Sequence, residues 1–245
     1  MSVFLLILAI DTSTRTGSVA LLRDSVLLGK VSSHEETPYS TRLFTDLEKL
    51  KSHAPFQINQ IDVFAVASGP GSFTGLRIGL TAVKAWAEVH GRPIAAVSGL
   101  EAICAQSAHV AGTPPIEVRT FAPFFDARRG QLFGALYRRS SADPFSLEPV
   151  GEESIFSPEE FIDMVRGRAE PYHPQLISSA RDLISPELLQ AYLSGAEVEI
   201  VSPALAPTIG RLAFERAKRG ILLDAMHLDA NYVRRSDAES KWKDG

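Results

Sequence analysis

The chain has 245 residues, 45% of them hydrophobic, and a formal net charge of −4. This length allows a sizeable core in one large domain or two small ones. The single cysteine, Cys104, excludes an internal disulfide and favours a reducing compartment, so we expect a cytoplasmic protein. The acidic balance disfavours direct binding of a long nucleic acid, because such binding depends on Lys and Arg neutralising phosphates.

An apolar run over residues 4–10 predicts a buried strand and not a signal peptide. No basic residue precedes the run, and Asp11 follows it directly without a small-residue cleavage site. No stretch reaches the ~18 apolar residues that a membrane-spanning helix needs, so we expect no contact with a membrane.

The first part of the chain alternates strand and helix patterns. Three strands in an antiparallel meander are expected first, over residues 5–10, 17–22 and 26–31. They are followed by a helix over 40–50, a strand over 61–67, a helix over 74–90, a strand over 94–97 and a helix over 99–110. The sequence Ala-Gly-Thr-Pro-Pro at 111–115 then predicts a boundary between domains 1–111 and 112–245.

The second part of the chain predicts a mixed set of strands and helices. Residues 117–125 and 131–138 alternate around a turn at 126–130, which is typical of a hairpin. Ser157 and Pro158, followed by two acidic residues, mark the start of a helix. A last long helix is expected from near Pro203 or Pro207 to Gly220, in the second domain, followed by a polar tail from Ser236. The whole pattern predicts an α/β fold with two lobes, each containing a mixed β-sheet.

A carboxylate and two hydroxyls follow the first strand, as Asp11, Thr12 and Ser13. Such groups at the carboxyl end of a strand suit phosphate or metal-bound nucleotide chemistry. The alternative is an Asx or ST turn that leads into the next strand. Spacing alone favours the turn.

A glycine-rich turn lies between the strand at 61–67 and the helix at 74–90. Gly69, Gly71 and Gly75 permit positive φ angles and close approach of another group, and the helix start beside Ser72 offers free N–H groups to an anion. The spacing G-x-G-x-x-x-G is one residue off the dinucleotide fingerprint, and the Lys-Ser/Thr of a P-loop is missing. A phosphate site and a purely structural strand-to-helix turn therefore remain equal alternatives.

The helix after this turn is apolar on nearly every side, so we expect it to be buried on more than one face. Together with an apolar stripe on the helix at 40–50, it predicts an interface with another chain, unless the second domain covers it. The residues expected in this interface are Leu43, Phe44, Leu47, Leu76, Leu80, Val83 and Trp86.

Candidate catalytic residues are scarce. The six histidines contain no pair at i and i+4 that would ligate a metal on a helix, and Cys104 lies on an apolar helical face. The stretch from Gly71 to Gly75, which contains Ser72, is one residue too long for a nucleophile elbow. We therefore predict neither a catalytic residue nor a metal site.

Five segments together resemble the bacterial TsaB family: residues 7–14, 68–79, 97–100, 126–130 and 232–239. The resemblance implies an actin-like ATPase (ASKHA) fold, shared with sugar kinases and heat-shock ATPases. It also implies a non-catalytic dimerisation subunit that pairs with a TsaD-like catalytic subunit and supports a TsaE-like ATPase. Together these proteins transfer a threonylcarbamoyl group to N6 of adenosine 37 in tRNAs that read codons beginning with A.

The resemblance also bears on metals, nucleotides and oligomeric state. TsaD carries a His-Met-Glu-Gly-His-like metal motif, and Gly99 and Ile103 stand at its two histidine positions when the sequences are aligned on Val97. The resemblance thus implies no cofactor of this chain's own and contact with tRNA through the complex. Weak ATP or ADP binding at the complex interface and a homodimer of the lone chain are left open. Two enzymes remain as alternatives: an ATP-binding or hydrolysing enzyme that uses Asp11 and Thr12, and a glycoprotease-like metallopeptidase, disfavoured by the missing ligands.

Overall fold

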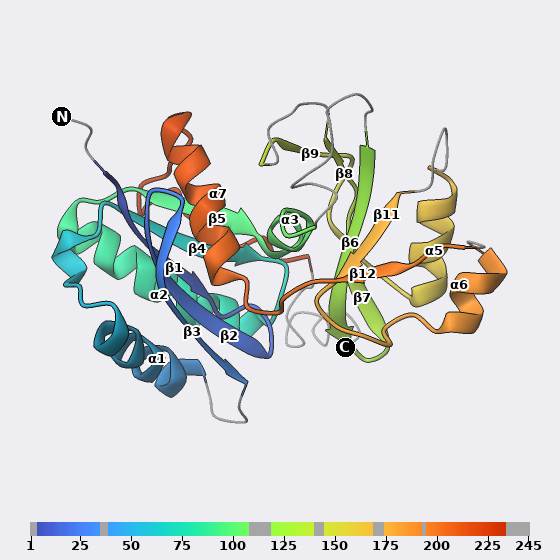
Figure 1. The fold of residues 1–245 in the computed structure, drawn as a ribbon, viewed down its shortest axis with the longest axis horizontal. Coiled ribbons are helices and arrows are strands. Elements are labelled where there is room, and N and C mark those ends of the chain that lie inside the picture. The colour runs from blue at the N-terminus through green and yellow to red at the C-terminus, as the bar shows by residue number, and fades with distance from the viewer. Residues whose placement is uncertain are drawn as a thin grey trace, which may run out of the picture. The chain divides into compact units, whose positions relative to one another are not determined.

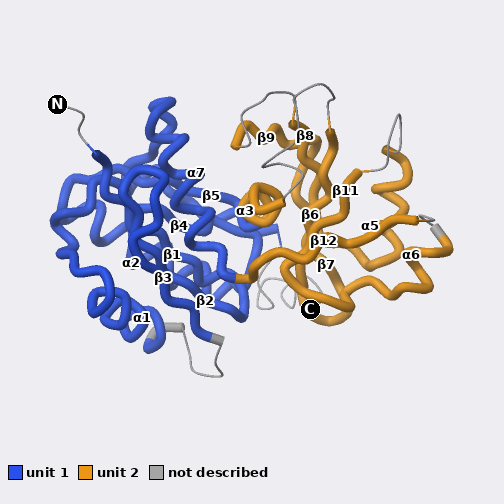
Figure 2. The backbone as a smooth tube through the Cα atoms, in the orientation of Figure 1, with its two compact units in different colours: residues 1–99, 204–245 blue, residues 100–203 orange. Residues whose placement is uncertain are grey.

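The computed structural model describes residues 4–34, 39–107, 119–139, 145–168, 174–192 and 195–233. The chain divides into two compact units, each with its own β-sheet (Figures 1 and 2). Unit 1 comprises residues 1–99 and 204–245, and unit 2 comprises residues 100–203. The prediction of an α/β fold with a mixed sheet in each of two lobes is confirmed.

Unit 1 is built on a five-stranded sheet with the order β3-β2-β1-β4-β5. β1 pairs antiparallel with β2 and parallel with β4, so the predicted meander continues into parallel strands joined by a helical crossover. Its elements are β1 (Leu6–Asp11), β2 (Thr16–Arg23), β3 (Val26–His34), α1 (Tyr39–His53), the 3-10 helix η1 (Ile58–Gln60), β4 (Val63–Gly69), α2 (Phe73–His90), β5 (Ile94–Ser98) and α7 (Ala206–Lys218).

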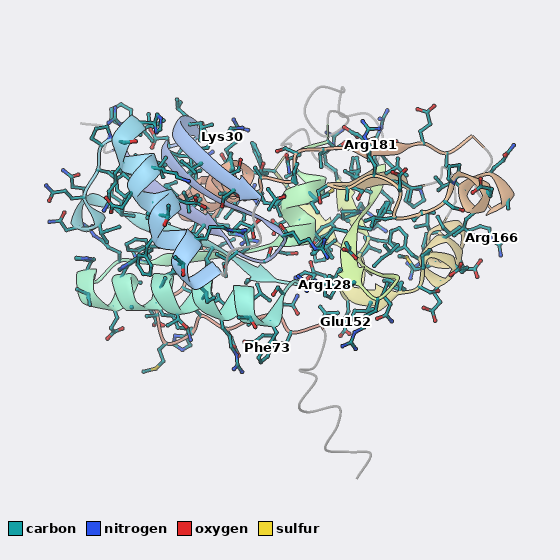
Figure 3. All side chains as sticks on the ribbon, turned by 90° about the horizontal axis from the view of Figure 1, so that it is seen from below. Lys30, Phe73, Arg128, Glu152, Arg166 and Arg181 are labelled. Atoms are coloured by element: carbon teal, nitrogen blue, oxygen red, sulfur yellow. The ribbon has the colours of Figure 1, made fainter. Side chains whose placement is uncertain are left out.

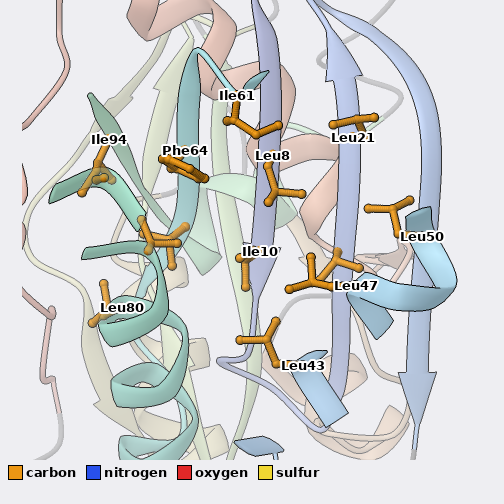
Figure 4. Close-up of a cluster of buried hydrophobic side chains, with 14 of the residues drawn as sticks. Leu8, Ile10, Leu21, Leu43, Leu47, Leu50, Ile61, Phe64, Leu80 and Ile94 are labelled. Carbon is orange, nitrogen blue, oxygen red and sulfur yellow. The ribbon is translucent and has the colours of Figure 1, made fainter. Parts of the chain in front are cut away.

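Alternate residues of this sheet supply two separate apolar faces. Leu8 pairs with Leu21 on the face that packs against α1 and α2, and the resulting core is shown in Figure 4. The neighbouring residues along these strands, such as Leu22, point to the opposite face and meet α7. The buried runs of the sequence are continuous because helices cover both faces of the sheet.

The last helix, α7, belongs to unit 1 and not to the second lobe, so the expected division into 1–111 and 112–245 is corrected. Ser18 on β2 accepts a hydrogen bond from the Ala206 amide at 3.0 Å, which fixes the start of α7 on the first sheet. Gly210 faces Leu22 so closely that a Cβ at that position would overlap the leucine side chain. The chain therefore returns to its first sheet after completing unit 2.

Unit 2 contains a seven-stranded sheet. Its main path is β10-β7-β6-β11-β12, with β8 paired to β6 and β9 paired to β8. Its elements are α3 (Gly99–Cys104, which begins at the boundary), β6 (Arg119–Arg128), β7 (Gln131–Gly134), β8 (Tyr137–Arg139), β9 (Leu147–Pro149), β10 (Ser154–Phe156), α5 (Pro158–Arg166), β11 (Gln175–Ser178), α6 (Pro186–Tyr192) and β12 (Val198–Ile200). The side chains of α5 and α6 pack on this sheet in a second core.

The local predictions in unit 2 have mixed outcomes. Ser157 caps α5 and forms a reciprocal capping box with Glu160, as the sequence indicated. The β6–β7 hairpin is also confirmed, although its second strand is interrupted at Ala135 and continues as β8. Within the described residues the helix predicted over 99–110 ends at Cys104. The predicted boundary at 111–115 and the tail from Ser236 lie outside the described ranges. No helix in those ranges combines the length and hydropathy needed to cross a membrane.

We predict that Gly210→Ala lowers the free energy of unfolding, because the added methyl group would overlap Leu22 across the α7–β2 contact. Overpacking of this kind costs roughly 1–3 kcal/mol, against ~1 kcal/mol that alanine gains from its helix propensity. Denaturant unfolding would measure the difference. Gly167→Ala is the matched control, since a Cβ there meets only ordinary contacts at 3.5 Å or more. A midpoint raised for Gly210→Ala, by the ~1 kcal/mol that helix propensity alone would add, would contradict the packing of α7 on β2.

Candidate functional site

The segment Asp11–Ser13 leaves the end of β1 and folds back on itself. The Asp11 carboxylate is fully buried, and its Oδ1 atom accepts hydrogen bonds from the Ser13 amide at 2.8 Å and the Ser13 hydroxyl at 2.6 Å. The Thr12 hydroxyl donates to the Gly75 carbonyl at 2.7 Å. The hydroxyls of this segment thus serve an Asx turn and a contact with α2, as the structural alternative expected.

The glycine-rich turn lies directly against this segment. The Ser72 amide donates to the Ser13 carbonyl at 2.8 Å. A Cβ at Gly71 would lie 2.5 Å from the Ser13 carbonyl oxygen, and one at Gly75 would overlap the Thr12 carbonyl oxygen. The close approach that these glycines permit is therefore made by the chain's own backbone. Ser72 caps α2 by accepting a hydrogen bond from the Gly75 amide at 3.3 Å.

Gly69, the first glycine of the turn, is covered by a distant part of the chain. Gly69 has a φ of +123°, a backbone conformation that favours glycine. A Cβ at Gly69 would overlap the Asn231 carbonyl oxygen, and the Asn231 amide donates to the Ser68 carbonyl at 2.7 Å. The structure thus brings together all six residues predicted as a nucleotide site, but it fills the faces of Gly69, Gly71 and Gly75 with backbone.

Asp11 is electrostatically unusual. Its Oδ2 atom is buried and has no hydrogen-bond partner among the described residues. Burial raises the pKa of Asp11 from 3.8 to about 6, even though the hydrogen bonds from Ser13 and the positive charge of Arg42 act to lower it. Arg42 is itself buried and donates to the Arg15 carbonyl at 3.3 Å. The site therefore holds a buried carboxyl group that is easily protonated.

The helices α1 and α2 cover the other predicted site, the partner interface. Most of the residues expected there face the core of their own unit instead: Leu43, Leu47, Leu76, Leu80 and Val83 are buried. Trp86 is half-buried and packs against Phe64, with ring centroids 5.9 Å apart. Only Phe44 is largely exposed, at 58%. An exposed stripe follows the length of α2 at helical spacing, so the lone chain leaves one face of the helix uncovered, and its burial by a partner stays a prediction.

An open apolar groove lies where α1 and α2 meet. It has a volume of about 490 Å³ and is lined by Leu43, Phe44, Phe73, Thr74, Arg77, Ile78, Thr81 and Ala82. Leu43 and Phe44 are the two members of the predicted interface that line it. Sequence reasoning missed the contributions of Phe73, Arg77 and Ile78. The spacing of four residues between Phe73 and Arg77 along one helix was the available signal, and the strongly apolar neighbours obscured it.

The residues weighed for catalysis are not assembled into a reactive group. Cys104 is buried in α3, and burial, followed by the negative charge of Glu101, raises the pKa of its thiol well above the ordinary value. Ile103, which stands at a ligand position of the TsaD motif, is buried in the core. Within the described ranges, no three His, Cys, Asp or Glu side chains lie close enough together to hold a metal ion.

Comparison with known proteins identifies the family. A family model described as "TsaD: tRNA N6-adenosine threonylcarbamoyltransferase" matches residues 35–217. The tRNA threonylcarbamoyladenosine biosynthesis protein TsaB of Bacillus subtilis (strain 168) is 30% identical over 236 residues, which cover 96% of this chain and 97% of that protein. The chain belongs to the TsaB family.

Further relatives agree with this assignment. The protein of the same name from Escherichia coli (strain K12) is 31% identical over 156 residues, which cover 62% of this chain and 63% of that family member. A crystal structure from Pseudomonas aeruginosa, described as an uncharacterized protein with similarity to peptidase YEAZ, matches with a TM-score of 0.70 and 22% identity. The match covers 94% of this chain and 100% of that one. The likeness shows that the two chains share one fold.

We predict that the stability of the protein falls as pH rises through the titration of Asp11. The folded-state pKa of about 6 lies above the ~3.9 of an unfolded aspartate, so between these values the folded state holds a proton that the unfolded state has lost. The free energy of unfolding should decrease with pH across this window and level off above it. Asp11→Asn should remove the slope and stabilise the protein at pH 8, by at most ~3 kcal/mol.

Denaturant unfolding between pH 4 and pH 8 would measure this effect. Asp163→Asn, which alters an exposed carboxylate on α5, should keep the wild-type slope. If the free energy of unfolding depended on pH in the same way for Asp11→Asn and the wild type, ionisation of Asp11 would not destabilise the folded protein, contrary to this account.

Proposed function

We propose that the chain is the non-catalytic pairing subunit of the machinery that makes threonylcarbamoyladenosine in tRNA, and that it pairs with a TsaD-like catalytic subunit. The near full-length likeness to the B. subtilis protein supports the role in this biosynthesis. The apolar groove between α1 and α2 carries the proposal of pairing, because it is an exposed apolar hollow on an otherwise well-packed unit.

The shape and chemistry of the groove suit an apolar helix from a partner. Phe44 and Ile78 project from two different helices, and Ala82 is small enough to let another side chain approach closely. Thr81 and Arg77 supply polar groups at the edge, which is the usual arrangement of an apolar centre with a polar rim. A helix in a groove between two helices is a recurrent mode of recognition.

The absence of catalysis is supported by the state of the candidate groups. The hydroxyls of Thr12 and Ser13 are engaged with the chain's own backbone and carboxylate, and the glycine faces are occupied. The second candidate, an ATP-binding enzyme, has one observation in its favour: the Oδ2 atom of Asp11 has no hydrogen-bond partner within the part of the chain that the structure describes. A phosphate would nevertheless have to displace Thr12 and Ser13 from the glycine-rich turn, which weighs against that candidate.

The wider assembly follows from the same proposal. A TsaE-like ATPase would act on the paired subunits, and tRNA would be bound by the complex and not by this acidic chain alone. The location would be the cytoplasm, where tRNA is modified. Self-association of the chain through the same groove would compete with the catalytic subunit.

Reconstitution would test the proposal. A mixture of the catalytic subunit, the TsaE-like ATPase, tRNA, and the precursors of the threonylcarbamoyl group should form threonylcarbamoyladenosine only when this chain is added. The chain alone should modify no tRNA. Full activity in its absence, or modification by the chain alone, would refute the assigned role.

We predict that Phe44→Glu and Ile78→Glu each weaken binding to the catalytic subunit by at least ~10-fold, since a charge would be buried in an apolar contact. Phe44 is 58% exposed, so Phe44→Glu should change the melting temperature little, whereas Ile78 also packs against the core, so Ile78→Glu should lower it as well. Binding would be measured by calorimetry, with size-exclusion chromatography to detect self-association. Val89→Glu is the control, because Val89 is 76% exposed on α2 away from the groove. Leu80→Glu would be a poorer test, because Leu80 is buried in the core.

A further inference from the structure

The segment after α7 forms a strap, residues 221–233, along the free edge of the first sheet. Near its start, Leu223 exchanges two backbone hydrogen bonds with Ile94 of the edge strand β5, at 2.7 and 2.8 Å. Leu228 is buried in the core beneath α2, and the Asn231 amide bonds to Ser68 at the end of β4. The strap therefore runs from the last turn of α2 back towards its first turn.

The described part of the strap ends in contact with the groove. The ring of Tyr232 lies 5.0 Å from the ring of Phe73, and the Tyr232 hydroxyl accepts a hydrogen bond from Arg77 Nε at 3.3 Å. The Arg77 guanidinium lies 3.9 Å above the Phe73 ring. Phe73, labelled in Figure 3, and Arg77 are one helical turn apart on α2, and both line the groove. Tyr232 thus fixes the orientation of two residues of its wall.

This arrangement has a consequence for binding. A free arginine loses much rotamer freedom when a partner orders it, and the loss weakens the affinity. Here Arg77 stacks on Phe73 and donates to the Tyr232 hydroxyl before any partner arrives. Each contact is individually weak and partly exposed, since Tyr232 is 40% accessible. The groove wall is accordingly ordered by a contact that a single substitution removes without opening the core.

We propose that Tyr232 is a positioning residue for pairing: it latches the C-terminal strap to the groove wall and raises the affinity of the groove for the catalytic subunit. This inference rests on the proposed function, because it takes the catalytic subunit as the occupant of the groove. The latch acts by ordering Phe73 and Arg77 in advance and not by a catalytic contact.

Binding of the catalytic subunit to full-length variants, measured by calorimetry, would test the latch. Tyr232→Ala should weaken binding by about tenfold, equivalent to ~1.4 kcal/mol, with little change in melting temperature. Tyr232→Phe, which keeps the ring but loses the hydroxyl acceptor, should recover most of the affinity. Met226→Ala is the control, since Met226 is 86% exposed on the same strap and does not line the groove. In a double-mutant cycle, Arg77→Ala should cost less in the Tyr232→Ala background than in the wild type.

Wild-type affinity in Tyr232→Ala, or an equal loss in Met226→Ala, would overturn the inference. A second measurement on the free chain separates its failure from that of the proposed function. The Arg77 Nε–H resonance should be displaced by the two rings in the wild type and return to an averaged position in Tyr232→Ala. If the wild type does not bind the catalytic subunit at all, the proposed function fails, and the resonance still decides whether Tyr232 holds Arg77. An unchanged resonance in Tyr232→Ala would refute the latch itself.

Discussion

The contact between the Thr12–Ser13 backbone and the glycine-rich turn fixes the position of α2. The Ser72 amide meets the Ser13 carbonyl, and the Thr12 hydroxyl meets the Gly75 carbonyl, so the first turn of α2 is held at the end of β1. Only glycine fits at positions 71 and 75, because any Cβ would collide with these carbonyl oxygens. The same contact covers the faces of Gly71 and Gly75, which weighs against a phosphate there, and the Oδ2 atom of the buried Asp11 has no hydrogen-bond partner among the described residues. Packing of the turn and exclusion of an anion are thus two results of one constraint.

The placement of α2 in turn creates the groove that is proposed as the pairing surface. With its inner face committed to the core through Leu80 and Val83, the helix presents Ile78 and Ala82 towards α1, where the groove forms. The strap that closes the sheet edge ends at this groove through Tyr232. Three segments far apart in the sequence therefore meet at the start of α2: the end of β1, the glycine-rich turn and the C-terminal strap. In this account the end of β1 and the glycine-rich turn support the groove that is proposed to bind the catalytic subunit.

Much of unit 1 could be predicted because its strands are continuous apolar runs and its helices have clear periodicity. Ser157 and Glu160 could be recognised because a capping box is local in the sequence. The assignment of α7 to the first sheet could not be predicted, because the sequence of a helix does not indicate which of two sheets it packs against. The strands β11 and β12 have only four and three residues, too few to show alternation. For the site, the sequence indicated that the end of β1 and the glycine-rich turn lie together, but the burial of Leu76 and the approach of Asn231 depend on tertiary contacts that periodicity cannot reveal.

The central claim is that the chain's own backbone, and not a nucleotide, packs against the glycine-rich turn. Calorimetric titration of the purified chain with Mg-ATP tests it most directly. The account predicts no saturable heat and no rise in melting temperature up to millimolar nucleotide. Saturable binding at micromolar nucleotide, abolished by Asp11→Asn, would contradict the account and restore a phosphate site at Gly69–Gly75.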